Sequence, residues 1–146
     1  MTEIRELKPE EIRIYLRLLS ELDEKKRMPE EEARALFHEI RRYPYYKIYC
    51  VCSEDKMIGT YTLIILDNFG HGGLKIAIVE NVAVAPDARH AGIGRKMMDD
   101  AMQRAKDNGC YKLMLSSDIK RSGAHAFYDS LGFQRHGISF RTELNK

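Results

Sequence analysis

The chain has 146 residues, of which 44% are hydrophobic and 32% charged, and its 24 basic and 22 acidic side chains leave a net charge of +2. This length suits a single domain, 1–146, that can bury a sizeable core. The charge balance gives no indication of nucleic-acid binding, and the longest aliphatic run, Leu63 to Leu66, is far too short to span a membrane. We therefore expect a globular, cytoplasmic protein with no nucleic-acid or membrane partner.

The three cysteines, Cys50, Cys52 and Cys110, are an odd number and include no C-x-x-C pair. This usage fits a reducing compartment and argues against both a disulfide framework and zinc, so no metal site is expected. Cys110 is interpreted as a small buried hydrophobe. Cys50 and Cys52 share one face of a predicted strand, and chemical activity of this pair stays open.

The first part of the chain predicts one strand and two helices. Residues 3–7 form the strand, and Pro9 with two following glutamates begins the first helix. Its apolar stripe comprises Ile12, Tyr15, Leu16, Leu19 and Leu22. After the charged stretch 23–27, Pro29 precedes a second helix that ends at Pro44. Its apolar stripe comprises Ala33, Leu36, Phe37 and Ile40.

Three strands are predicted next. Residues 47–53 and 58–67 are rich in β-branched and aromatic side chains, and the short segment 54–56 between them predicts a hairpin. A flexible loop, 68–73, leads to a strand over 75–85. This strand is apolar on both faces, which is typical of a central position in a sheet.

The last part alternates helix and strand. A helix over 93–108 ends at Gly109, a left-handed stop, and turns Ile93, Met97, Ala101, Met102 and Ala105 inward. The strand that follows, at 113–115, should lie parallel to the strand over 75–85. Ser122 is expected to cap a short helix closed by Gly132, and a final strand pair over 133–144 completes a mixed α/β sheet.

The most informative motif lies between the central strand and the long helix, from Arg89 to Gly94. Glycines there let the backbone close on phosphate oxygens, and the helix start offers unpaired N–H groups with a partial positive charge. Met97 stands where a dinucleotide fingerprint has its third glycine, and no Gly-Lys-Ser/Thr ending is present. The segment therefore predicts an anion site but neither an NAD site nor a P-loop.

The stretch from Val79 to Gly94 resembles the acetyl-CoA signature of the GNAT superfamily of N-acetyltransferases, Gln/Arg-x-x-Gly-x-Gly/Ala after a strand. Two further stretches carry the resemblance in the family's order. Gly109 to Leu115 is similar to the family's next strand, and Phe127 to Phe133 matches its Phe-Tyr-x-x-x-Gly-Phe ending. Three ordered motifs within one short region are far more specific than the glycine loop alone.

The resemblance implies a three-layer GNAT-like α/β fold. Its central mixed sheet would have about six to seven strands with about four helices, and the fourth and fifth strands would splay apart where acetyl-CoA enters. In such a fold the backbone of Val82, Ala83 and Val84 binds the pantetheine arm of coenzyme A. The pyrophosphate would be bound by Arg89, His90, Ala91, Gly92, Ile93, Gly94 and Arg95. From the residues alone, these two segments are equally compatible with sheet core and a solvated helix start.

Glu80 and Tyr128 are the catalytic candidates. Glu80 stands between apolar residues of a predicted strand, where burial would raise its pKa and suit it to deprotonate an amine; the family resemblance gives a glutamate here the same role. A salt bridge, for example from Lys75, is the structural alternative. Tyr128 matches the family's general acid for the departing thiolate, although its helical stripe equally suits a packed core tyrosine.

His71 and Tyr46 lie in segments that border the acceptor pocket in related proteins, although a loop histidine is usually just exposed. Residues 118–128 look like those of the aminoalkylphosphonate N-acetyltransferases, and Lys120, Arg121 and His125 would suit an anionic acceptor. Contacts to the cofactor's 3′-phosphate or simple exposure are the alternatives for these cations.

The resulting prediction is an acetyl-CoA-dependent N-acetyltransferase that transfers the acetyl group directly to a primary amine of a small molecule. Acetylation of a protein N-terminus or lysine, and a non-catalytic coenzyme A-binding domain, are the two alternatives. The small-molecule amine is the expected partner. A homodimer that pairs the C-terminal strands of two subunits, around Phe140 and Leu144, is compatible with the resemblance.

Overall fold

The computed structural model describes residues 1–20, 22 and 28–145. The chain separates into two compact units, Met1–Met114 and Leu115–Lys146. The charged stretch 23–27 of the sequence analysis lies outside the described residues. No helix in the described part is long and apolar enough to cross a membrane.

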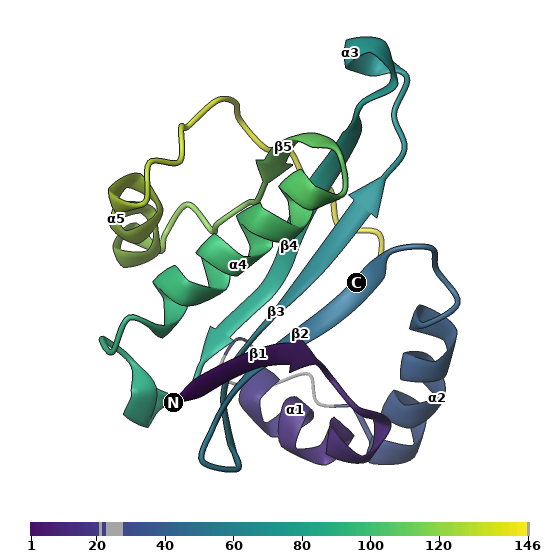
Figure 1. The fold of residues 1–146 in the computed structure, drawn as a ribbon, viewed down its shortest axis with the longest axis vertical. Helices are drawn as coiled ribbons and strands as arrows, with labels where there is room; N and C mark the ends of the chain where they lie inside the picture. The colour runs from purple at the N-terminus through teal and green to yellow at the C-terminus, as the bar shows by residue number, and fades with distance from the viewer. Residues whose placement is uncertain (21, 23–27, 146) are drawn as a thin grey trace. The chain divides into compact units, whose positions relative to one another are not determined.

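The first unit is built on a five-stranded sheet, in which β1 to β5 lie in the order of the chain (Figure 1). The strands are β1 (Thr2–Glu6), β2 (Tyr46–Ser53), β3 (Lys56–Leu66), β4 (Lys75–Val84) and β5 (Cys110–Met114). Neighbours from β1 to β4 are antiparallel, whereas β4 and β5 are parallel. The predicted mixed α/β sheet, with β4 flanked by strands on both sides, is confirmed.

Helices cover both faces of this sheet. A 3₁₀ turn, η1 (Pro9–Glu11), runs into α1 (Ile12–Leu19), and α1 packs with α2 (Glu30–Ile40) on one face. The long helix α4 (Ile93–Asp107) crosses the other face (Figure 1). Two short elements complete the unit: α3 (Gly70–Gly73), in the loop between β3 and β4, and η2 (Pro86–Ala88) after β4. The three predicted layers are therefore present.

The β2–β3 hairpin closes through a two-residue turn. Glu54 and Asp55 both adopt left-handed conformations, with φ of 48° and 66°. Two successive left-handed residues form the type I′ turn whose twist matches that of antiparallel strands. The predicted hairpin is confirmed, with the turn one residue shorter than the segment expected from the sequence.

Most predicted apolar stripes point inward, with three corrections. Leu36 and Met102 are 45% and 36% exposed, and Leu22 is exposed beyond the end of α1. On α2 the buried residues Ala33 and Phe37 are one turn apart, and Leu36 lies about 100° around the helix from Phe37. An apolar side chain one step off the stripe therefore extends the pattern without reaching the core.

The face beneath α4 combines apolar contacts with one polar network. The buried residues of α4 are Ile93, Met97, Met98, Ala101 and Ala105. The Tyr61 hydroxyl donates to Asp100 Oδ2 at 2.5 Å, and Arg104 Nε donates to the same oxygen at 2.7 Å. The Arg104 guanidinium also lies 4.0 Å from the centre of the Tyr49 ring. These contacts tie the second half of α4 to β2 and β3.

The second unit contains α5 (Ser122–Ser130), which Gly132 ends with a φ of 86°, as predicted. The cap is different from the prediction: Arg121, not Ser122, is the N-cap residue, and its side chain makes no capping bond.

The final strand pair predicted over 133–144 is wrong. Residues 133–144 contain no strand, and Ile138, Phe140 and Leu144 are 83%, 90% and 87% exposed. An alternating pattern forms a stable strand pair only when one face can be buried. No such burial occurs here, so the sheet has five strands instead of six or seven.

Gly59 of β3 sets how closely α4 approaches the sheet. A Cβ at this position would lie 3.1 Å from Ile93 Cγ2 and 3.2 Å from Met97 Sδ, both on buried side chains. Gly59→Ala should therefore lower the free energy of unfolding by about 1–3 kcal/mol in denaturant titrations, because the helix must shift outward.

Gly123 offers the matched control, since it is helical and a Cβ there would meet no atom within 4 Å. Gly123→Ala should leave stability unchanged or raise it by up to about 1 kcal/mol. Equal stability of the Gly59→Ala variant and the original protein would contradict the close approach of α4.

Candidate active site

The strand β4 is paired on both sides for only part of its length. Its parallel pairing with β5 covers Lys75 to Ile78, and in the described residues no β5 partner faces the part that continues to Val84. On its other side β4 stays paired with β3 as far as Val84. The Val84 carbonyl accepts a hydrogen bond from Arg89 Nε at 3.3 Å. The other main-chain groups along this edge, from Val82 to Val84, are available to a ligand that pairs like a strand. The predicted splay between the fourth and fifth strands is present.

A bulge interrupts β4 at the same place. Thr62 pairs with Glu80 and Thr60 with Ala83, so β4 uses three steps where β3 uses two. Asn81, the residue after Glu80, has a φ of 52°. A bulge re-aims the side chains and main-chain groups around it. Here the regular register with β3 ends at Glu80 and begins again at Ala83.

The loop before α4 has the geometry of an anion site. His90 and Gly92 adopt left-handed conformations, with φ of 66° and 79°, and Gly92 is the N-cap of α4. A Cβ built on Gly92 would meet no atom within 4 Å, so the space in front of the helix start is open. The first N–H groups of α4 have no acceptor within the helix and are the donors for an anion.

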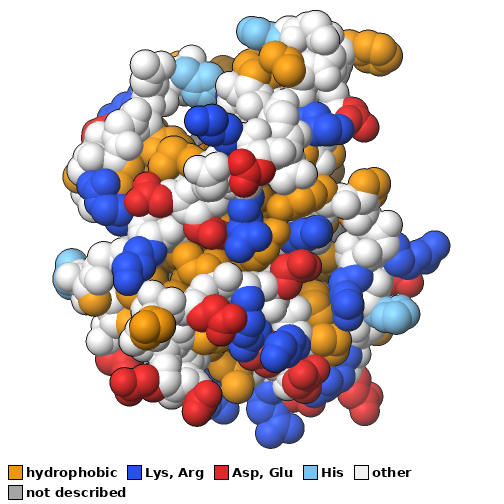
Figure 2. Space-filling model, in the orientation of Figure 1, with side chains coloured by type: hydrophobic (Ala, Val, Ile, Leu, Met, Phe, Trp, Pro, Cys, Tyr) orange, Lys and Arg blue, Asp and Glu red, His pale blue; other side chains and the backbone are white. Residues whose placement is uncertain are grey.

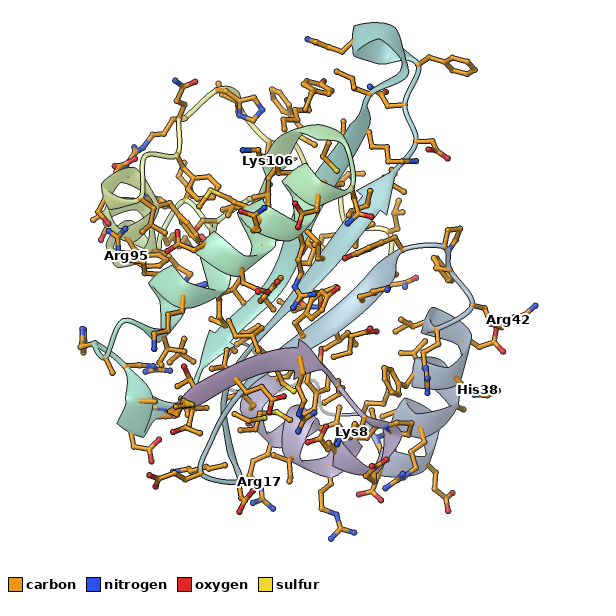
Figure 3. All side chains as sticks on the ribbon, viewed as in Figure 1. Lys8, Arg17, His38, Arg42, Arg95 and Lys106 are labelled. Atoms are coloured by element: carbon orange, nitrogen blue, oxygen red, sulfur yellow. The ribbon has the colours of Figure 1, made fainter. Side chains whose placement is uncertain are left out.

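The charges of α4 support this interpretation. Its first turn has no acidic residue but carries Arg95 and Lys96, whereas Arg104 and Lys106 stand in its last turn (Figure 3). Basic residues stabilise a helix C-terminus and oppose the positive end of the dipole at the N-terminus. Arg95 and Lys96 thus add positive charge to an end that is already positive, which favours a bound anion.

This basic character is local. Lys and Arg side chains alternate with Asp and Glu over the face of the first unit that carries α4 and β1, without a large area of one sign (Figure 2). The first turn of α4 is therefore a candidate anion site because of its backbone geometry as much as its charge.

Glu80 is exposed, which corrects the burial assumed from its apolar neighbours. The strand register is regular as far as the Thr62–Glu80 pair. Glu80 shares a face of β4 with the partly exposed Ile78, whereas the buried Ala77 and Val79 lie on the other face. The proposed salt bridge is not formed either: Lys75 pairs with Asp67, and no ion pair of Glu80 occurs among the described residues. The carboxylate is therefore accessible to a substrate amine or to water.

The structure brings Tyr46 and Glu80 together. Burial raises the pKa of Tyr46, and the charge of the Glu80 carboxylate raises it further. Tyr15 of α1 is a third polar group near them, and burial raises its pKa to about 12. Sequence reasoning missed Tyr15, because its position in the apolar stripe of α1 indicates only packing.

His71 lies apart from Glu80. It belongs to the loop before β4, has a φ of 51°, and stacks on Tyr111 of β5 with ring centres 4.0 Å apart. Glu80 is five steps along β4 from Lys75, the first residue of the strand, which corresponds to about 16 Å of extended chain. His71 precedes this start of the strand and is exposed.

Tyr128 lies in α5 of the second unit and is partly buried. Its ring makes edge contacts with Phe127 and Phe133, at centre distances of 5.1 and 5.7 Å. The Phe133 N–H also donates to the Tyr128 carbonyl at 3.2 Å. Burial raises the pKa of Tyr128, so the hydroxyl keeps its proton at neutral and mildly alkaline pH.

Comparison with known proteins decides the family. The model of the acetyltransferase (GNAT) family matches residues 12–133. The chain belongs to the GNAT family of acetyltransferases. It is 30% identical to a glucosamine 6-phosphate N-acetyltransferase of Trypanosoma brucei brucei over 97% of this chain and 95% of the relative. The protein is thus an N-acetyltransferase, as the three sequence motifs predict.

Solved structures of this family confirm the fold. A glucosamine-6-phosphate N-acetyltransferase from Arabidopsis thaliana superposes with a TM-score of 0.88 at 26% identity, over 99% of each chain. An acetyltransferase from Trypanosoma brucei superposes with a TM-score of 0.85 at 29% identity, over 99% of this chain and 100% of that one. The specific likeness to aminoalkylphosphonate N-acetyltransferases stays a prediction.

Gly92 provides a test of the loop geometry. Gly92→Ala should lower the free energy of unfolding by about 1–2 kcal/mol, since alanine is strained at a φ of 79° although space is open around it. His90→Gly, two residues earlier, should leave stability unchanged or raise it, because His90 already holds a left-handed conformation. Thermal and denaturant unfolding of both variants measure the contrast, and a loss of stability in His90→Gly alone would contradict this loop conformation.

Proposed function

We propose that this N-acetyltransferase uses acetyl-CoA to acetylate the amino group of a phosphorylated amino sugar of the glucosamine 6-phosphate type. The observation that carries the proposal is the similarity to the Trypanosoma brucei brucei relative of that name, which extends over nearly the whole of both chains. The same name belongs to the Arabidopsis thaliana structure that superposes over 99% of each chain. Protein acetylation and non-catalytic binding are not favoured by these relatives.

The residues of the first unit fit coenzyme A. The unpaired edge of β4 suits the two amides of the pantetheine arm, and the glycine-capped start of α4 suits the pyrophosphate. In this arrangement the main chain of Val82, Ala83 and Val84 holds the arm. The pyrophosphate is bound by Arg89, His90, Ala91, Gly92, Ile93, Gly94 and Arg95.

The chemistry assigned to the chain's own residues is proton transfer at the two ends of the reaction. Acetyl-CoA supplies an acyl group that its thioester activates toward amines. Glu80, exposed beside the bulge, takes the proton from the attacking ammonium directly or through a water molecule. The N–H of Val82 polarises the carbonyl oxygen of the acyl group.

Tyr128 completes the proposed reaction as the general acid that protonates the departing thiolate. Its raised pKa favours the protonated form that this role needs. Tyr46, near Glu80, and the more distant His71 are the proposed acceptor contacts. Lys120 and Arg121, both exposed at the start of α5, are the candidate partners of the acceptor's phosphate.

The substrate proposal predicts strong dependence on the phosphate group. With acetyl-CoA and a thiol reagent as readout, kcat/KM for glucosamine 6-phosphate should exceed that for glucosamine by at least about 100-fold, because a charge-assisted site loses several hydrogen bonds without the phosphate. Arg121→Gln should raise KM for the phosphorylated sugar and leave that for glucosamine unchanged. Preference for a peptide or a neutral aminoglycoside in the same assay would overturn the proposal.

The catalytic proposal predicts that Glu80→Gln and Tyr128→Phe each lower kcat by about 10²–10⁴-fold, the usual contribution of a general acid or base. Because the pKa of Tyr128 is raised, the wild-type enzyme should lose no activity through ionisation of this hydroxyl below pH 9. Steady-state kinetics across pH and thermal unfolding are the measurements.

Tyr61→Phe is the matched control for Tyr128→Phe. It removes a hydroxyl bonded to Asp100 on the face of the sheet that carries α4, and should lower stability by about 1–3 kcal/mol while kcat is kept. Glu54→Gln, in the hairpin turn, serves in the same way for Glu80. If Tyr128→Phe loses stability and keeps its turnover, Tyr128 is a packed tyrosine and the role as acid is wrong.

A further inference from the structure

Outside the candidate active site, two cysteines and a glutamate converge on the face of the sheet that carries α1. Cys50 and Cys52 extend from β2 to the same side, with their sulfurs 3.8 Å apart. Glu11 reaches them from the last position of η1, just before α1. One ligand atom from each of the three residues lies within 4.8 Å of the other two. The three residues come from two elements that are far apart in the sequence.

The separation of the sulfurs matches a tetrahedral metal. Two sulfurs at about 2.3 Å from zinc, with a tetrahedral angle of about 109° between them, lie about 3.8 Å apart. Cys50 and Cys52 already have this distance. A disulfide would require them to close to about 2.05 Å. In the structure this distance is that of a hydrogen bond from the Cys52 thiol to Cys50 Sγ, and the two sulfurs need not move apart or together to share an ion.

The carboxylate of Glu11 is held as a metal ligand usually is. Arg5 Nη1 and Nη2 donate to its two oxygens at 2.9 and 2.7 Å, and the Lys8 N–H donates to Oε1 at 2.9 Å. Outer hydrogen bonds of this kind fix the orientation of a ligating carboxylate. Oε1 accepts two of them, whereas Oε2 accepts one and keeps a lone pair for a metal. Arg5 Nη1 also lies 3.6 Å from Cys50 Sγ.

The charges of the cluster balance with one divalent cation. Glu11 and two thiolates carry three negative charges, and Arg5 carries one positive charge. A divalent cation makes the sum zero, which matters because Cys50 is fully buried.

We propose that Glu11, Cys50 and Cys52 form a zinc site that binds one Zn²⁺ and leaves a fourth position to water. The two thiols release their protons to solvent as the sulfurs coordinate the ion, and no oxidation occurs. The sequence alone argued against zinc because it lacks a C-x-x-C pair. The fold supplies the third ligand from another element, which spacing along the chain does not show. The bound ion would link β2 to the start of α1 and so stabilise that side of the sheet.

Cobalt(II) is the probe, because it takes zinc sites and its bonds to thiolates give a strong charge-transfer absorption. The reduced full-length protein should bind one Co²⁺ per chain with this absorption, Zn²⁺ should displace it, and Zn²⁺ should raise the unfolding temperature. Cys52→Ser should weaken Co²⁺ binding by more than about 100-fold, since even an outer-shell change costs 10–100-fold. Cys52 is chosen because it is partly exposed, so that serine is tolerated there.

Cys110→Ser is the matched control, as Cys110 is also a partly buried strand cysteine but lies on β5. This variant should keep the absorption and the thermal shift. Glu11→Gln should keep the thiolate absorption and weaken binding, and its metal-free unfolding curve shows separately what the lost Arg5 pair costs.

Three results would overturn the proposal. The first is a folded wild-type protein that shows no thiolate absorption with Co²⁺ in several-fold excess. The second is an absorption that depends on Cys110 instead of Cys52. The third is a Cys50–Cys52 disulfide in the purified protein, seen as a mass lower by two hydrogens. This result overturns the proposal if metal binds only after the disulfide is reduced and the disulfide is too stable to be reduced under the conditions of a cell.

Discussion

The candidate site depends on a single constraint, which is that β4 leaves one of its two neighbouring strands before it ends. A central strand normally satisfies its main-chain groups on both edges, and groups left without a partner must find water or a ligand. β4 has β5 beside it only as far as Ile78, while β3 holds the other edge to Val84. The strand is therefore held in place along one edge and lacks a strand partner along part of the other. The bulge at Asn81 lies in this incomplete part and directly follows Glu80, which stands on the exposed face of the strand. The same backbone thus positions both the groups proposed to bind coenzyme A and the carboxylate proposed to act as base.

The packing of α4 on the sheet fixes the position of the proposed pyrophosphate site at the start of this helix. Gly59 lets its first turn come within contact of β3, and the pair formed by Asp100 and Arg104 ties its second half to Tyr61 and Tyr49. A helix held at both ends presents its first N–H groups at a defined height above the sheet. Binding a pyrophosphate there needs little further ordering, which is how a preformed site gains affinity. Without an anion, the basic residues of the first turn are repelled by the positive end of the helix dipole and lower the stability of the helix. A bound anion would remove this repulsion.

Sequence reasoning predicted the elements whose signals are local. It missed features that depend on which other part of the chain packs against a segment. The hairpin at Glu54 and Asp55, the end of α4 at Gly109 and the parallel pair of β4 and β5 follow from turn residues and periodicity, and all are present. The strand pair over 133–144 failed because an alternating pattern needs a surface to cover. The predicted burial of Glu80 was wrong because apolar neighbours in the sequence do not show how completely each face of a strand is covered: Ile78, on the same face, is only partly buried. Likewise, the spacing of Cys50 and Cys52 shows that they share a face, but not that Glu11 lies beside them.

Backbone strain is concentrated where the site is expected. Five non-glycine residues of the described chain have positive φ, and Glu54 and Asp55 account for two of them in a turn that requires it. The other three are His71, Asn81 and His90, which lie in the loop before β4, in its bulge and in the loop before α4. Glycine would relieve each of these positions, so these side chains are kept at a cost of order 1–3 kcal/mol apiece. Strain of this size persists only where surrounding structure imposes it. One of these residues lies within β4 and the other two lie in the segments before and after it. The strand proposed to bind coenzyme A is thus also the place where the fold imposes backbone conformations that these residue types do not prefer.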